Sequence, residues 1–479
     1  MQRRDVIRQG QKRLPANYQG AWGIPGALLA ASMLLSGCGL ASAPTGSLQP
    51  QSTAGVSLNG RVHGGQQPVS GSSVYLFAAS NSGYAAAATS LLKTATAGVS
   101  TDVIGNGYVI TDAAGNFSIT GDYTCPSSDA QVYLLASGGN PGLPSPTAKN
   151  DDIALMAALG NCGNLNASTF VIVNEVTTVA AVYALAPFMR DAQHIGTPST
   201  NLAGLVEAFN GAAQLSNTAN GSSPGPALPA GATLSVAQID TLANILASCI
   251  NSAGGLAGDG SICASLFANA PADSDQRNDT ISSMRSIATH PSSNISGLFS
   301  LVTSNGPFQP TLVSAPNDWT ISAQYKPSGL TTPRGIAIDA NNTVWIADCG
   351  SAACASTGVG KVMQLGSDGA LVNSTAAGLL NVPVALAIDQ GGSAWVANYA
   401  GNSVTKLNVN LTAAGAAYAG GGLNSPNSIA IDPAGQAWVT NAGNGSVTVL
   451  SSSGTALTPS SGYSGVSIPT PVGILINSH

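Results

Sequence analysis

The sequence predicts a multidomain α+β protein: a β-sandwich, then a helical domain, then a partial β-propeller. Three similar segments begin at Pro333 (P-R-G-I-A-I-D), Pro383 (P-V-A-L-A-I-D) and Pro426 (P-N-S-I-A-I-D), and such a repeat indicates propeller blades. Short alternating apolar and polar runs between Gly and Pro residues precede residue 148, which is typical of strands. Apolar residues at helical spacing fill much of residues 149–308.

Residues 1–38 predict an export signal that ends in a lipid-attachment site. Five basic residues open the chain: Arg3, Arg4, Arg8, Lys12 and Arg13. The apolar stretch that follows, residues 24–35, is too short to span a membrane. Ser36, Gly37 and Cys38 resemble the bacterial lipobox, in which Cys38 would carry the lipid; the alternative is an ordinary signal sequence with a chance cysteine.

The residue after Cys38 bears on the cellular location of the mature protein. Gly39 in this position, by resemblance to the sorting rules of Gram-negative bacteria, implies an outer-membrane or cell-surface location. The expected membrane partner is therefore the bilayer itself, through the lipid on Cys38. Residues 39–55 are rich in Ser, Pro, Gln and Gly, which predicts a flexible tether.

The charge balance argues against nucleic acid as a partner. The leader holds five of the 15 Lys and Arg residues and one of the 21 Asp and Glu residues, which leaves 10 basic and 20 acidic residues in the mature part. The phosphate backbones of nucleic acids bind to basic patches on proteins, so an acidic chain is unsuited to bind nucleic acid.

Six cysteines remain once Cys38 is set aside, and an exported chain with an even number of cysteines predicts disulfides. We expect neighbours to pair, although other connectivities stay open. The six are Cys125, Cys162, Cys249, Cys263, Cys349 and Cys354. No C-x-x-C pair with histidines at metal-binding spacing occurs, so neither a zinc site nor another cofactor is expected.

Residues 56–148 are expected to form the β-sandwich. The runs P-V-S-G-S-S-V-Y-L-F from Pro68 and T-D-A-A-G-N-F from Thr111 resemble prealbumin-like modules of bacterial surface proteins and carboxypeptidase regulatory domains. The resemblance implies a stalk or spacer, and occasionally a carbohydrate-binding module.

Residues 149–308 are expected to form a compact domain of five to seven helices. Ser235 and Gln238 predict a capping box ahead of a helix whose buried face carries Cys249, so that a bridge to Cys263 would join two helices. Glu175 and Glu207 are isolated carboxylates, which we expect on helix surfaces or at helix caps.

Residues 309–479 are expected to hold three full blades plus fragments of others. Leu365, Leu407 and Leu450 mark corresponding strands 42 and 43 residues apart. The first copy carries an insertion with Cys349 and Cys354. The pattern resembles the NHL-repeat family and, more loosely, the propeller of virginiamycin B lyase, whose rings hold more blades. The blades could close as an undersized ring or form an open arc covered by the helical domain, or the gene product could be shortened.

Two sets of repeated polar residues have different predicted roles. Asp339, Asp389 and Asp432 open turns, and Trp345, Trp395 and Trp438 follow on the next strands, where we expect them to fill the space between blades. Asp348, Asn398 and Asn441 lie three residues beyond each Trp, at a strand end. Together with Tyr399 and the loop from Cys349 to Cys354, they form the predicted ligand-binding site.

These patterns favour an exported, lipid-anchored cell-envelope protein that binds a protein or glycan without catalysis. One alternative is a propeller lyase or hydrolase resembling virginiamycin B lyase. It needs a base near its substrate, yet the propeller segment has no Glu and only His479, so no catalytic residue is predicted. A structural envelope protein is the other alternative. The sequence leaves the oligomeric state open.

Overall fold

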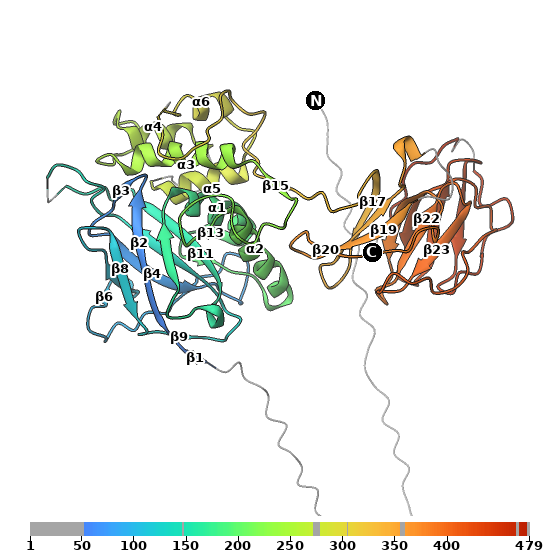
Figure 1. The fold of residues 1–479 in the computed structure, drawn as a ribbon, viewed down its shortest axis with the longest axis horizontal. Helices are drawn as coiled ribbons and strands as arrows, with labels where there is room; N and C mark the ends of the chain where they lie inside the picture. Colours follow the sequence, from blue (N-terminus) through green and yellow to red (C-terminus); the bar gives the residue numbers. More distant parts are fainter. Residues whose placement is uncertain are drawn as a thin grey trace, which may run out of the picture. The chain divides into compact units, whose positions relative to one another are not determined.

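The computed structural model describes residues 52–145, 148–271, 278–303, 305–354, 360–465 and 469–476 (Figure 1). The predicted signal peptide with Cys38, most of the tether and His479 lie outside the described residues. Within the described part of the chain, no helix combines the length and the apolar character of a membrane span. We describe in turn a sheet-and-helix body, which ends near residue 326, and three blades that begin at residue 333.

Two sheets form the framework of the sheet-and-helix body. The larger sheet has the strand order β11-β10-β4-β7-β6, with β5 paired to β4. Its strands are β4 (Ser73–Ala78), β5 (Thr89–Ser90), β6 (Ser100–Thr101), β7 (Gly107–Ile110), β10 (Gln131–Ser137) and β11 (Ala154–Asn161). The smaller sheet joins β2 (Ser57–Gly64), β3 (Gln67–Pro68), β8 (Asn116–Thr120) and β12 (Phe170–Val173). Only β2 and β12 pair in parallel among the described strands of these sheets.

Three short ribbons complete the pairing in this body. They are β1 (Thr53–Ala54) with β9 (Thr124–Cys125), β13 (Met189–Asp191) with β14 (His194–Ile195), and β15 (Thr233–Leu234) with β16 (Ala323–Gln324). The last ribbon pairs the chain after the helices with the chain between them.

Strands β11 and β12 lie inside residues 149–308, where helices were expected to begin. Strand β11 reads A-L-M-A-A-L-G-N, a continuous apolar run of good helix formers, and its first five residues are buried. Periodicity cannot separate such a doubly buried strand from a helix. The strands therefore continue to residue 173, and the resemblance of residues 56–148 to prealbumin-like modules stays a prediction.

Six α-helices are present among the described residues. They are α1 (Glu175–Leu185), α2 (Leu202–Leu215), α3 (Val236–Ile250), α4 (Ile262–Asn269), α5 (Thr280–Thr289) and α6 (Ile295–Phe299). Helices α1 and α2 contact β11, and α3 and α5 contact α1. Helices α1 and α2 therefore pack against the larger sheet at its edge strand β11, and the central strands β4 and β10 are buried along nearly their whole length.

The predicted capping box of α3 is wrong. Ser235 makes no side-chain capping bond. The Gln238 side chain instead donates hydrogen bonds of 3.1 Å to the carbonyl oxygens of Asp318 and Thr320, so it fastens the segment after the helices. A capping box does form at α1, between Asn174 and Thr177, where the sequence analysis had not placed one.

One hydrophobic cluster unites the sheets and the helices. It includes Leu58 and Leu76 from the two sheets, Val179 and Ile245 from helices α1 and α3, and Trp319 from the segment after α6. All five side chains are buried. The strands and the helices thus share a core instead of forming separate hydrophobic centres.

The expected pairing of neighbouring cysteines is confirmed. Disulfides join Cys125 to Cys162 and Cys249 to Cys263, and the second links α3 to α4 as predicted. The third joins Cys349 to Cys354 and closes the insertion of the first blade.

Three antiparallel sheets form the blades, coloured orange to red in Figure 1. Blade 1 consists of β17 (Pro333–Ile338), β18 (Val344–Asp348), β19 (Lys361–Leu365) and β20 (Leu371–Ser374). Blade 2 consists of β21 (Pro383–Ile388), β22 (Ala394–Asn398) and β23 (Ser403–Leu407). Blade 3 consists of β24 (Pro426–Ile431), β25 (Ala437–Asn441) and β26 (Ser446–Leu450).

The outer edges of blades 2 and 3 are reduced, and the fourth copy forms no blade among the described residues. Isolated bridges stand where blade 1 has β20: Val404 to Tyr418 and Leu407 to Ala413 in blade 2, and Val447 to Tyr463 and Leu450 to Ala456 in blade 3. Residues 471–476 begin a fourth copy of the repeat but form no strand. The inner strands of consecutive blades contact each other, β17 with β21 and β21 with β24. The described blades are thus a partial propeller.

Candidate functional site

Each blade contains the same hydrogen-bonded pair of an aspartate and a tryptophan. The indole Nε1 of Trp345 donates to Asp339 Oδ2 at 3.0 Å, and the same bond joins Trp395 to Asp389 at 3.0 Å and Trp438 to Asp432 at 2.9 Å. The other carboxylate oxygen accepts backbone N–H groups of the turn, as Asp339 Oδ1 does from Asn341 and Thr343. The structural role expected for these residues matches this geometry.

Hydrogen bonds favour the ionised form of these three aspartate carboxyls. Burial by itself raises the pKa of each, but hydrogen bonds from the indole and the turn outweigh it and hold the pKa below its ordinary value. Lys406 adds to this effect in blade 2, where its Nζ lies 2.9 Å from Asp389 Oδ2. Lys406 also lies over the ring of Trp395, 4.8 Å from its centroid.

The predicted ligand-binding residues at the strand ends are buried and hydrogen-bonded. The exposed fraction of Asp348 and Asn441 is 0%, and that of Asn398 is 2%. Each accepts a backbone N–H from the residue 17 positions earlier: Asp348 from Thr331 at 2.8 Å, Asn398 from Asn381 at 3.3 Å and Asn441 from Asn424 at 3.2 Å. These bonds hold the loop that leads into the inner strand of each blade.

Their remaining polar atoms are also engaged. The amide nitrogen of Asn398 donates to the hydroxyls of Ser403 and Thr405, and that of Asn441 donates to Ser446 and Thr448. The carboxylate of Asp348 accepts further bonds from Thr331, Thr332 and Gly350. Although burial raises it, these bonds leave the pKa of Asp348 lowered.

The strand-end residues therefore do not converge on an open pocket in the described structure. Of the predicted set, Tyr399 is exposed at 38%, as are Ala352 and Ala353 in the loop between the two cysteines. A cleft of about 370 Å³ lies nearby, lined by Thr331, Lys361 and Thr375 together with glycine backbone. The sequence could identify the repeated positions, but it could not show that the preceding loop folds back onto them.

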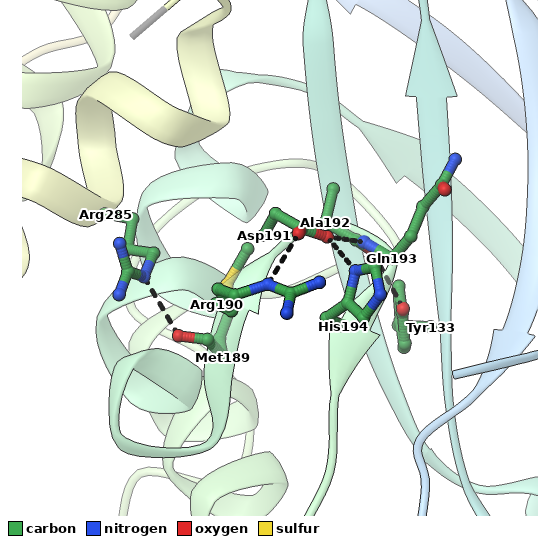
Figure 2. A network of polar contacts seen from close by, with 8 residues as sticks. All are labelled: Tyr133, Met189, Arg190, Asp191, Ala192, Gln193, His194 and Arg285. Atoms are coloured by element: carbon green, nitrogen blue, oxygen red, sulfur yellow. Dashed lines mark hydrogen bonds and ion pairs between the residues drawn. The ribbon is translucent and has the colours of Figure 1, made fainter. Parts of the chain in front are cut away.

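A second polar site lies in the sheet-and-helix body, at the hairpin of β13 and β14 (Figure 2). His194 Nδ1 lies 2.7 Å from Asp191 Oδ1, which also accepts the backbone N–H of Gln193 at 2.9 Å. Arg190 Nε approaches Asp191 Oδ2 at 3.3 Å. Burial raises the pKa of Asp191, but the bonds from His194 and Gln193 outweigh it and the pKa is lowered.

Two further side chains hold the hairpin from different elements. The Tyr133 hydroxyl of β10 donates to the carbonyl of Ala192 at 2.8 Å, and Arg285 Nε of α5 donates to the carbonyl of Met189 at 2.9 Å. Figure 2 shows these bonds on either side of the Asp191–His194 pair. The pair is therefore held on a rigid framework, which a binding site requires.

An open cleft of about 390 Å³ adjoins this hairpin. Its polar lining includes Ser137, Asp151, Asp191, His194 and Asp279. The side chains of His194 and Asp191 are 30% and 47% exposed. Sequence reasoning missed the cleft because these residues come from four segments between residues 137 and 279 and form no local motif.

The chemistry of this cleft stops short of a catalytic triad. A Ser–His–Asp triad needs the serine hydroxyl within hydrogen-bond reach of the imidazole. Among the described contacts, His194 bonds to Asp191 and no serine reaches its ring. The arrangement suits recognition of hydroxyl or amide groups on a polar ligand.

One group of possible metal ligands is disqualified by its own chemistry. Asp152, Cys249 and Cys263 bring ligand atoms close together. Both cysteines are joined in a disulfide, so neither can supply the thiolate that a metal binds. Asp152 Oδ2 accepts the backbone N–H of Gly255 at 2.7 Å.

Glu175 was expected on a helix surface or at a helix cap; it lies at the start of a helix, but its side chain is fully buried. It is the first residue of α1, and its Oε1 accepts the backbone N–H of Gly65 at 2.7 Å. Its Oε2 has no hydrogen-bond partner in the described structure. Burial raises the pKa of Glu175 to about 8, although its backbone bonds lower it.

The comparisons with known proteins give only distant likenesses to solved structures. No family model and no curated protein matches the chain. A catalytically inactive virginiamycin B lyase from Staphylococcus aureus, solved with quinupristin, is 20% identical over 27% of this chain and 41% of that chain, with a TM-score of 0.22. A putative gluconolactonase is 18% identical over 27% of this chain and 47% of that one, with a TM-score of 0.22.

A chain of the nidogen–laminin complex gives a similar result, with 19% identity over 27% of this chain and 47% of that chain and a TM-score of 0.23. The chain thus spans less than half the length of these three proteins. At these identities and TM-scores the likenesses carry no argument about this chain.

The Asp389–Trp395 bond predicts a specific stability effect. Replacing Asp389 with alanine leaves the indole N–H of Trp395 buried without an acceptor and Lys406 without its partner. We expect the free energy of unfolding of the blades to fall by about 1–3 kcal/mol, measured by urea unfolding followed by tryptophan fluorescence. Asp368→Ala, in an exposed turn of blade 1, is the control and should change it by less than about 0.5 kcal/mol. Equal losses would contradict the role given to the buried bond.

Glu175 predicts a pH dependence with a definite sign. The pKa is about 8 in the folded protein against an ordinary value of 4.5, so the folded state binds more protons between these values. The free energy of unfolding contributed by Glu175 therefore falls as pH rises through this window. We expect Glu175→Gln to gain stability over the wild type between pH 5 and pH 8, measured as the difference in urea midpoint. Glu207→Gln should show no such pH-dependent gain; a difference that is flat with pH for Glu175→Gln would refute the assignment.

Proposed function

We propose that the chain is an exported, lipid-anchored cell-envelope protein that serves as a non-enzymatic binding platform. The observation that carries the proposal is the hydrogen bonding of the blades. The repeated carboxylates and amides, from Asp339 to Asn441, bond to indoles, turns and loops of their own blades. Groups engaged in this way build a scaffold, and none of these repeated carboxylates and amides in the described blades is free to serve as the base of a lyase or hydrolase.

Export and anchoring have separate support. The three disulfides fit an oxidising compartment outside the cytoplasm. The basic leader, the short apolar stretch and Cys38 fit a lipoprotein signal. The acidic balance of the mature part fits a partner other than nucleic acid.

The ligand class that fits the body is a glycan or a polar protein segment. The cleft beside Asp191 and His194 offers carboxylate, imidazole and hydroxyl groups on a rigid hairpin. Such groups bond to hydroxyls and amides, which glycans and peptides carry in number. We assign ligand contact to this cleft and leave the blade strand ends a structural role.

The anchor is tested by metabolic labelling with radioactive palmitate in a Gram-negative host. We expect the wild type to carry the label and to sediment with membranes, and Cys38→Ser to lose both properties. Cys354→Ser, which changes a cysteine of the blades, should keep the label. An unlabelled wild type would contradict the lipid anchor.

Binding is tested with a panel of glycans and peptides against the full chain carrying Cys38→Ser. We expect a panel member to bind and to be recovered chemically unchanged, and His194→Ala to weaken binding at least tenfold. His290→Ala, an exposed histidine outside the cleft, is the matched control. Turnover of the bound compound would contradict a non-enzymatic role. No binding, together with loss of envelope integrity on deletion, would favour a structural envelope protein.

A further inference from the structure

The two junctions between blades follow one rule. Alternate residues of a strand point to opposite faces of its sheet, so each blade has two faces. One, the tryptophan face, carries small residues and the tryptophan: Ala337 and Trp345, Ala387 and Trp395, and Ala430 and Trp438. The other, the branched face, carries Ile336 and Ile338, Leu386 and Ile388, and Ile429 and Ile431.

In both junctions the tryptophan face of one blade packs on the branched face of the next. Trp345 and Ala337 of blade 1 share a hydrophobic cluster with Leu386 and Ile388 of blade 2. Trp395 and Ala387 of blade 2 share the next cluster with residues of blade 3, Ile429 and Ile431 among them. Gly335 allows this close approach, because a Cβ there would lie 2.8 Å from the Cα of Ala385.

The two halves of this junction stand open at the two ends of the described blades. On the branched face of blade 1, Ile336 is 68% exposed and Ile338 is 63% exposed, whereas Leu386 and Ile429 in the covered blades are 6% and 7% exposed. On the tryptophan face of blade 3, Trp438 is partly exposed, whereas Trp345 and Trp395 are fully buried.

A buried polar group lies at the open end of blade 3. The hydroxyl of Thr440, next to Ser428 on the tryptophan face of blade 3, is buried without a hydrogen-bond partner. One end of the described blades thus presents an uncovered tryptophan face, and the other end presents an uncovered branched face. Each open surface is complementary to the other, because the chain itself joins the same two surfaces twice.

We propose that two copies of this chain join their blades into one ring. The tryptophan face of blade 3 in each copy packs on the branched face of blade 1 in the other, through Ala430 and Trp438 on one side and Ile336 and Ile338 on the other. A propeller holds about four to eight blades, so the three described blades are too few to close a ring and six suffice. With six blades each turns by about 60°, so three blades span half a turn and a two-fold axis closes the ring.

The proposal commits to a second copy over other occupants of these faces. Residues 471–476, P-V-G-I-L-I, resemble an inner strand and could cover Trp438 within one chain. In the described structure Val472 and Leu475 of that segment are 78% and 90% exposed. The sheet-and-helix body could cover Ile336. Either event leaves the chain monomeric, which the experiment below detects.

The molar mass of the full chain tests the proposal. The probe is the chain with Cys38→Ser, so that no lipid or micelle contributes, measured by light scattering after size exclusion. We expect about twice the 47.3 kDa of one chain. Ile336→Lys and Ala430→Asp should each halve the mass. Val372→Asp, a matched change at a 64% exposed residue of β20, should keep the doubled mass. A monomeric wild type, or variants that stay dimeric, would overturn the proposal.

Mixing the two variants guards against simple misfolding. In a mixture of Ile336→Lys and Ala430→Asp, one junction of the ring is wild type and the other pairs lysine with aspartate. We expect the doubled mass to return. A mixture that stays monomeric, or a wild type that grows into larger species with concentration, would overturn a closed ring of two copies.

Discussion

The hydrogen bond between a turn aspartate and the tryptophan six residues later sets the geometry of every blade. In blades 1 and 2 it fixes a large ring on one face of the sheet, where the next blade supplies branched aliphatic residues. An indole buried without an acceptor would cost a large part of what its burial contributes. The strand-end residues Asp348, Asn398 and Asn441 act with this bond, since they fix the loop that enters each inner strand.

The sheet-and-helix body follows a different principle. Its strands and helices share one hydrophobic cluster, and the four cysteines of its two disulfides are buried in that cluster. The polar side chains around its cleft lie where elements from distant parts of the sequence meet. Tyr133 and Arg285 hold the hairpin of Asp191 and His194 from a strand and a helix. The blades thus provide repeated architecture, and the body provides the polar cleft that we assign to ligand contact.

Patterns confined to one segment were predicted well, and those that depend on distant contacts were not. The turn aspartates, the strand tryptophans and the pairing of neighbouring cysteines were expected from the sequence, whereas the bond that joins each indole to its carboxylate was not. Strand β11 was taken for helix because burial on both faces removes the alternation that marks a strand. Glu175 could not be placed, because its burial depends on Gly65, which is distant in sequence. Asp191 and His194 gave no signal, since only the fold brings them to a cleft.

The central claim is that each blade is organised by its indole-to-carboxylate bond. Hydrogen exchange of the indole N–H groups, followed by NMR on protein labelled at tryptophan, tests it most directly. The account predicts slow exchange for Trp345, Trp395 and Trp438, and faster exchange for Trp395 alone in Asp389→Ala. Exchange of all three at the rate of a free indole would contradict the account.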